Sequence, residues 1–291
     1  MSSVLYDAPG PRSRRRTAIG SVVAGIAILA VVALVVLRLA EQGQFDAELW
    51  SPWLDPTDDN FTAVWNLIGE AAANTVLAAA LSMAFSLVIG TLLALSRITA
   101  AAWYRWAIVG VIELLRGIPV VIAIFFAARV LPQFGVDLPT LWYLVIGLTA
   151  YNSVIIAEIV RAGINSLPVG QREAAESIGL RRSQVLGSVL LPQAFRVMLP
   201  ALISQLVVVL KDTSLGFIIS FEETVNTAGI IVQNLHNPIQ TYLIIAVLFI
   251  AVNYLLSKFA VYLERRLSRG KKAVSKKAEE AAMSETGRAG A

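Results

Sequence analysis

The chain has 291 residues, of which 57% are hydrophobic and 15% are charged, whereas a typical soluble protein has about 45 to 50% and about 25%. Its mean hydropathy is +0.70, and because a chain of this length still exposes a sizeable part of its surface, a water-soluble fold is nearly excluded. There is no Cys and a single His, His236, which excludes a thiolate metal site, a disulfide framework and a Cys nucleophile and disfavours a His-based catalytic relay.

Six apolar segments are long enough to cross a bilayer, whose core of about 30 Å takes about 20 helical residues. They are residues 18–37, 71–96, about 106–131, about 141–159, 199–219 and about 239–257. The pattern predicts an all-α, polytopic membrane protein with about six transmembrane helices. The first segment follows an Arg-rich start, but it is longer than the apolar part of a signal peptide, so we interpret it as an uncleaved anchor.

The basic residues indicate how the chain is oriented in the membrane. Most Lys and Arg residues lie at 12–16, 97–105, 161–196 and from 258 onward, whereas residues 39–96 and 212–257 have none. Because loops rich in Lys and Arg stay in the cytoplasm, we expect both termini to be cytoplasmic. The net charge of +4 therefore reflects membrane orientation and does not indicate nucleic-acid binding.

This orientation divides the chain into five expected parts. They are a basic cytoplasmic tail (1–17), a first transmembrane anchor (18–40), an acidic extracytoplasmic loop (41–70), the main membrane core (71–265) and a second basic cytoplasmic tail (266–291). The last part is rich in Lys, Glu, Ala and Ser and has too little apolar content to pack, so we expect it to be disordered.

The second apolar segment has a small or short polar residue at every fourth position. The series is Asn74, Ala78, Ser82, Ser86, Gly90 and Ala94. Residues at this spacing lie on one face of a helix, and small side chains allow a neighbouring helix to approach closely. We therefore expect this face to pack on another helix.

Residues 168–192 form a distinct polar segment between the fourth and fifth apolar segments. Residues 171–178 favour a helix, Gly179 suits the left-handed position that ends it, and residues 183–191 resume an apolar periodicity that Pro192 ends. The segment is predicted to be two short helices joined by a glycine turn. Such a projecting amphipathic unit binds either a partner protein or the lipid headgroups.

This segment resembles the E-A-A-x-x-x-G-x9-I-x-L-P loop of the membrane subunits of ATP-binding cassette (ABC) importers. The matching residues are Glu173, Ala174, Ala175, Gly179, Leu191 and Pro192, with Val189 at the Ile position. The resemblance implies a type I importer core in a bacterial cytoplasmic membrane, with this loop as the coupling helices that contact a pair of ATP-hydrolysing subunits. The chain itself has no G-x-x-x-x-G-K-[ST] motif, so ATP and Mg²⁺ are expected on those partner chains, with no cofactor or metal here.

Three other stretches are similar to the polar amino acid branch of these permeases. They are residues 113–119 (ELLRGIP), 157–163 (AEIVRAG) and 211–215 (KDTSL). The likeness covers about residues 74–263 and is greatest to the actinobacterial glutamate importers. It implies two further partners, a second permease subunit, identical or homologous, and an extracytoplasmic amino-acid-binding protein.

Several polar residues lie inside the apolar segments, where charges are costly and therefore pair or line a watery path. Glu113 with Arg116 and Glu158 with Arg161 are three residues apart on a helix, so each is either a structural ion pair or part of the translocation path. Gly117 and Pro119 directly follow the first pair and are expected to kink the helix.

The fifth apolar segment is interrupted by four polar residues, Lys211, Asp212, Thr213 and Ser214. A zwitterionic amino acid needs a cation for its carboxylate and an acidic or carbonyl group for its ammonium. We therefore place these four residues, together with Asn152 of the fourth segment, among the candidate solute contacts. A structural contact to a partner permease subunit is the alternative.

Three functions remain compatible with the sequence. The favoured one is the membrane subunit of an ATP-driven amino acid importer that works by alternating access. A transporter driven by an ion gradient would also explain charges in the membrane, although it has no use for the E-A-A loop. A third is a scaffold half of a heteromeric permease that contacts the ATPase and binds no solute.

Overall fold

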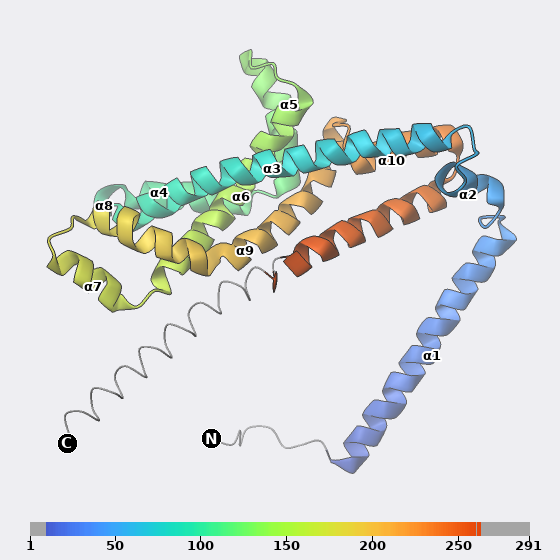
Figure 1. Ribbon diagram of the computed structural model, residues 1–291, viewed down its shortest axis with the longest axis horizontal. Helices are drawn as coiled ribbons and strands as arrows, with labels where there is room; N and C mark the ends of the chain where they lie inside the picture. Colours follow the sequence, from blue (N-terminus) through green and yellow to red (C-terminus); the bar gives the residue numbers. More distant parts are fainter. Residues whose placement is uncertain (1–9, 260, 263–291) are drawn as a thin grey trace, which may run out of the picture.

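The computed structural model describes residues 10–259 and 261–262, so the tail expected at 266–291 lies outside the described residues. The described part is helical and contains no strand. Its helices are α1 (Pro11–Glu41), α2 (Ala47–Leu54), α3 (Phe61–Thr99), α4 (Ala102–Gly117), α5 (Val120–Val130), α6 (Thr140–Asn165), α7 (Val169–Ser177), α8 (Arg182–Gln184), α9 (Leu191–Asp212) and α10 (Thr224–Leu235). A last helix, Pro238–Phe259, follows. In Figure 1, α2 and α10 lie at one end of the bundle and α7 and α8 at the other.

The predicted number of membrane segments agrees with the structure. Among the described residues, five helices are long and apolar enough to span a membrane, and a bent helix pair raises the number to six when it is taken as one span. The bend separates α4 from α5 by 99°, at the place where Gly117 and Pro119 were expected to kink the chain. In Figure 1, α5 projects away from the long axis of the bundle.

Helix α1 stands apart from the other helices (Figure 1), and none of its residues is buried. It begins at Pro11, seven residues before the predicted start of the anchor at residue 18. Proline suits the first position of a helix and Arg is a good helix former, so the helix includes the Arg-rich stretch that we expected in a tail.

The segment expected to be an acidic loop is largely folded. It contains α2 and the first turns of α3, and its apolar residues Trp53, Val64 and Ile68 form one buried cluster with residues of α10 and the last helix. The Trp53 Nε1 donates a hydrogen bond to Thr241 Oγ1 at 3.3 Å. The sequence did not reveal this contact because its two partners lie 188 residues apart.

The small-residue face of α3 packs as predicted. Of the series named above, only Asn74 is not buried. The packing partner is α6, and a Cβ atom added at Gly90 would lie 2.5 Å from the Ser153 carbonyl oxygen. The two backbones are therefore in direct contact at this glycine, which is the mode of packing expected between helices in lipid.

Candidate functional site: the coupling hairpin and the membrane charges

The polar segment 168–192 begins with a helix that ends at a left-handed glycine, as predicted. Helix α7 is followed by Gly179, whose φ is +84°. Apart from the glycine itself and its two chain neighbours, no atom lies within 4 Å of the place where its Cβ would be. The need for glycine therefore comes from the backbone conformation and not from crowding. We call α7, the Gly179 turn and α8 the coupling hairpin.

The three residues of the E-A-A sequence differ in their surroundings. Glu173 and Ala174 are exposed on α7, whereas Ala175 is 5% exposed and belongs to the buried cluster that joins α7 to α6 and α9. Glu173 and Ala174 are therefore available to a partner protein. Ala175 instead packs α7 against the transmembrane helices, and its small size lets α7 lie close to them.

The second arm of the predicted unit differs from expectation, because Pro192 does not end a helix. A π-helical segment, Val185–Leu190, connects α8 to α9, and α9 begins at Leu191. The nitrogen of Pro192 cannot donate the usual backbone hydrogen bond, and the wider π turn before it lets the helix continue without one. Arg182–Ile219 is consequently one helical run, so the coupling hairpin continues directly into the fifth span.

Glu113 and Arg116 do not pair with each other. Both side chains are exposed on α4, and no ion pair between them occurs in the described part of the chain. The helix ends at Gly117, immediately after Arg116. The structure therefore does not provide the self-neutralising contact that was one of the two interpretations of this pair.

Glu158 and Arg161 do pair, and they do so in a larger network. The Arg161 Nη2 lies 2.7 Å from Glu158 Oε2, and Arg97 of α3 donates to Glu158 Oε1. From the sequence, Arg97 was only a signal of membrane orientation. The network links the ends of α3 and α6 near the coupling hairpin, and its side chains are 25 to 39% exposed.

Asn152 is fully buried between α6 and α9. Its Oδ1 accepts a hydrogen bond from Gln205 Nε2 at 2.8 Å, and its Nδ2 donates to the Leu148 carbonyl at 2.8 Å. Both ends of the amide are thus used within the protein. This residue joins two helices in the present conformation, and Gln205 is a partner that sequence reasoning missed.

The four polar residues of the fifth span lie where its helix changes form. Lys211 is exposed, Asp212 is the last residue of α9, and Thr213 begins a 3₁₀ helix, Thr213–Ile219. The hydroxyls of Thr213 and Ser214 donate to backbone carbonyls of the preceding turn, at 2.7 and 2.6 Å. Lys211 is therefore the residue of this set with an exposed charged group.

Lys211 and Ser214 line a groove of about 580 Å³ together with residues of the last helix. Tyr242 and Asn253 are the polar residues that this helix adds to the lining. A charge at membrane depth faces water or a partner and not lipid. Lys211 is the charged residue of this groove, and its other lining residues are apolar or neutral polar.

The family of the chain follows from comparison with known proteins. Residues 86–269 match the family described as the inner membrane component of binding-protein-dependent transport systems. The chain belongs to this family. It is a permease subunit of an ABC importer, so ATP is hydrolysed on a separate subunit, and the family works with a solute-binding protein. A carrier driven by an ion gradient, our second hypothesis, is thereby excluded.

Curated relatives support the same assignment. The permease is 37% identical over 240 residues to the glutamate transport system permease protein GluD of Corynebacterium glutamicum. The aligned region covers 80% of this chain and 85% of that protein. It is also 37% identical over 191 residues to the probable glutamine ABC transporter permease protein GlnP of Bacillus subtilis, covering 64% and 85%.

Solved structures are similar to the permease in fold. A crystal structure of an amino acid ABC transporter with histidines matches with a TM-score of 0.65 and 29% identity, and it covers 72% of this chain and 99% of that one. An inward-facing methionine ABC transporter, at 20% identity and a TM-score of 0.61, shows the fold alone. The predicted type I core is confirmed.

One buried acid of the permease was not recognised from the sequence. The side chain of Glu223 is inaccessible to solvent and caps α10, where Val225 N and Asn226 N donate to its carboxyl oxygens at 2.8 and 2.7 Å. Burial raises the pKa of Glu223 to about 7, although the two backbone hydrogen bonds oppose this effect. A carboxylate before a helix is a recognisable cap signal, but its burial is not visible in the sequence.

The stability of the permease is expected to depend on pH through Glu223. The folded protein binds the proton of the Glu223 carboxyl more tightly than the unfolded chain does. The contribution of this carboxyl to the free energy of unfolding is therefore fully present below pH 4.5 and is lost as the pH rises through about 7. The loss is up to about 3 kcal/mol. When thermal unfolding is measured between pH 5 and 8, the melting temperature of Glu223→Gln should fall less with increasing pH than that of the wild type. Glu222→Gln, a change at the exposed neighbour, should behave like the wild type. Equal pH profiles of the wild type and Glu223→Gln would refute this role.

Proposed function

We propose that the permease imports a polar amino acid, with glutamate or a close analogue as its solute. The observation that carries this proposal is the 37% identity to a glutamate permease over 85% of that protein's length. We further propose that ATP and Mg²⁺ bind to a pair of partner ATPases and that a second permease subunit, identical or homologous, completes the pathway.

The proposed solute contact is the groove at Lys211. The Lys211 ammonium offers a cation to a carboxylate, and Ser214, Tyr242 and Asn253 offer neutral polar groups in the same groove. An acidic amino acid has two carboxylates, so a lysine at membrane depth supports a solute of this class. Asp212 follows Lys211 in the sequence but does not line the groove, so its proposed contact with the solute ammonium requires a different position of its side chain.

Coupling in this proposal follows the chain from the hairpin to the groove. Glu173 and Ala174 contact the ATPase, and closure of the ATPase pair moves α7. The Gly179 turn passes this movement to α8, and because Arg182–Ile219 is one helical run, it then reaches Lys211 along continuous helix. The spans then change between outward-open and inward-open arrangements.

The test of the solute contact is uptake by a Lys211→Gln variant. Loss of a charged hydrogen bond is expected to raise the KM for glutamate about 10- to 100-fold, with little change in ATP hydrolysis. Lys258→Gln is the matched control, because Lys258 lies over the Tyr254 ring and does not line the groove. Unchanged glutamate uptake by Lys211→Gln would favour the scaffold function, in which this half binds no solute.

We also propose that both termini and the coupling hairpin are cytoplasmic. The distribution of Lys and Arg supports this orientation. Because the chain has no Cys, single cysteines at Ser183 and His236 can be labelled separately with an impermeant thiol reagent. Ser183→Cys should react only from the cytoplasmic side and His236→Cys only from outside. Reaction of both from one side would contradict the orientation.

A further inference from the structure

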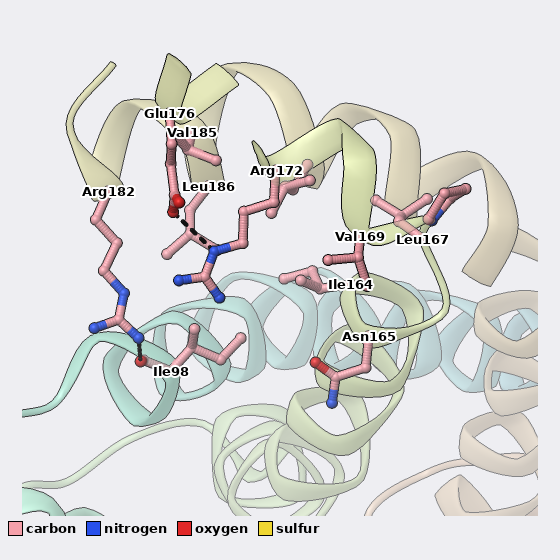
Figure 2. Close-up of a pocket in the computed structure, with 12 residues that line it drawn as sticks. Ile98, Ile164, Asn165, Leu167, Val169, Arg172, Glu176, Arg182, Val185 and Leu186 are labelled. Atoms are coloured by element: carbon pink, nitrogen blue, oxygen red, sulfur yellow. Dashed lines mark hydrogen bonds and ion pairs between the residues drawn. The ribbon is translucent and has the colours of Figure 1, made fainter. Parts of the chain in front are cut away.

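A small cavity lies between the coupling hairpin and the ends of the transmembrane helices α3 and α6. Its volume is about 190 Å³. Figure 2 shows residues of α7, α8 and the π-helical segment on one side and residues at the ends of α3 and α6 on the other. Most of the wall is apolar, with Ile164, Val169 and Leu186 among its residues. Such a wall favours a ligand that has an apolar part.

Two guanidinium groups line this cavity. Arg172 Nε donates to Glu176 Oε1 at 2.8 Å, and Arg182 Nη2 donates to the carbonyl of Ile98 at 3.0 Å. In Figure 2 both arginine side chains extend from the hairpin elements toward the end of α3. Each keeps further N–H groups for which the described residues provide no acceptor. With one carboxylate and two guanidinium groups, the lining has an excess positive charge.

Two exposed tryptophans follow the end of α3 in the sequence and indicate the level of the lipid headgroups. Trp103 and Trp106 are 78% and 74% exposed at the start of α4, only a few residues after Ile98. Exposed tryptophans of a membrane protein gather where the apolar core meets the headgroups. The ends of α3 and α6 at Thr99 and Asn165 fall in the same zone. By this argument, the arginines of the cavity are expected near the level of the lipid phosphates.

The cavity and the proposed ATPase contact use different faces of α7. All four residues are exposed, but Arg172 and Glu176, one helical turn apart, line the cavity, whereas Glu173 and Ala174 do not. Residues adjacent in a helix point about 100° apart. A ligand in the cavity therefore leaves Glu173 accessible.

We propose that this cavity binds the phosphate group of an anionic phospholipid, with Arg172 and Arg182 as its ligands. Guanidinium groups bind phosphate through paired, charge-assisted hydrogen bonds. The apolar wall accommodates the glycerol and the first acyl carbons, which a free phosphate lacks. A bound lipid connects α7, α8 and the end of α3, so it fixes the coupling hairpin relative to the membrane. The proposal concerns lipid binding and does not depend on which solute is transported.

The test uses the purified complex of the permease with its ATPase, in nanodiscs of phosphatidylcholine with increasing phosphatidylglycerol. Phosphatidylglycerol is expected to raise the melting temperature of the complex and its ATPase activity. The double variant Arg172→Gln/Arg182→Gln should lose both responses. Arg181→Gln removes one equivalent charge from the hairpin outside the cavity and should keep both.

Each alternative outcome overturns the proposal. If phosphatidylglycerol has no effect on the wild type, the cavity binds no anionic lipid. If Arg181→Gln and the double variant lose the response equally, the effect comes from general surface charge. If inorganic phosphate at millimolar concentration produces the full effect in phosphatidylcholine nanodiscs, the site binds a free anion and not lipid.

Discussion

Replacement of Gly179 by Val is expected to reduce ATP-driven uptake at least tenfold while the chain still inserts into the membrane. The backbone at Gly179 has a φ of +84°, and a β-branched residue there costs roughly 1–3 kcal/mol. That cost is enough to shift α7 away from its present position relative to α8. The membrane spans do not depend on this turn, so insertion should be preserved. Uptake and ATP hydrolysis in membrane vesicles, at equal subunit content, measure the effect.

Gly179→Asn is the matched control for this substitution. Asparagine enters the left-handed region more easily than other non-glycine residues, and no atom beyond the two chain neighbours lies within 4 Å of its Cβ position. Uptake by Gly179→Asn should therefore remain well above that of Gly179→Val. Similar uptake by the wild type and Gly179→Val would show that the hairpin geometry is not needed for coupling.

Replacement of Gly90 by Ala is expected to destabilise the helix bundle strongly. The added Cβ would lie 2.5 Å from the Ser153 carbonyl oxygen and 2.9 Å from two atoms of Ile156, so α3 and α6 would have to separate. Overpacking of this kind typically costs about 1–3 kcal/mol, and Gly90→Leu should prevent stable folding. The measurement is thermal unfolding of the detergent-purified permease.

The control for Gly90 is in the same helix. Gly69 of α3 has no atom within 4 Å of the position that an added Cβ would take, and alanine favours a helix by about 1 kcal/mol over glycine. Gly69→Ala should thus be neutral or stabilising. If Gly90→Ala unfolded at the same temperature as Gly69→Ala, the close approach of α3 and α6 would be refuted.

Local features of the fold could be predicted well from the sequence. The Gly90 face was visible because helix packing in lipid depends on small side chains at every fourth position. The turn at Gly179 was visible because glycine is favoured at left-handed positions after a helix. The bend after Arg116 followed in the same way from Gly117 and Pro119. In each case the signal lies within a short stretch of sequence, although the partner of the Gly90 face, α6, could not be identified from it.

Other features depend on contacts that one sequence does not display. Pro192 was expected to stop a helix, but the π turn before it depends on how the hairpin packs onto the core. The Arg97–Glu158 contact joins residues 61 positions apart, so only Arg161, three residues from Glu158, could be predicted as a partner. For the same reason, distance along the sequence, the contact between α2 and the last helix and the contact of Asn152 with Gln205 could not be predicted.

Accumulation of a polar amino acid at the expense of ATP hydrolysed by partner subunits is the activity that we assign to this permease. The direct measurement is uptake into proteoliposomes that contain the permease, its ATPase and any second permease subunit, with the binding protein outside and ATP and Mg²⁺ inside. We expect glutamate to accumulate against its gradient only with hydrolysable ATP, and to a much lower level with the Gly179→Val variant. Accumulation driven by a sodium or proton gradient without ATP would contradict the account, as would an absence of ATP-driven uptake of glutamate and every other polar amino acid tested.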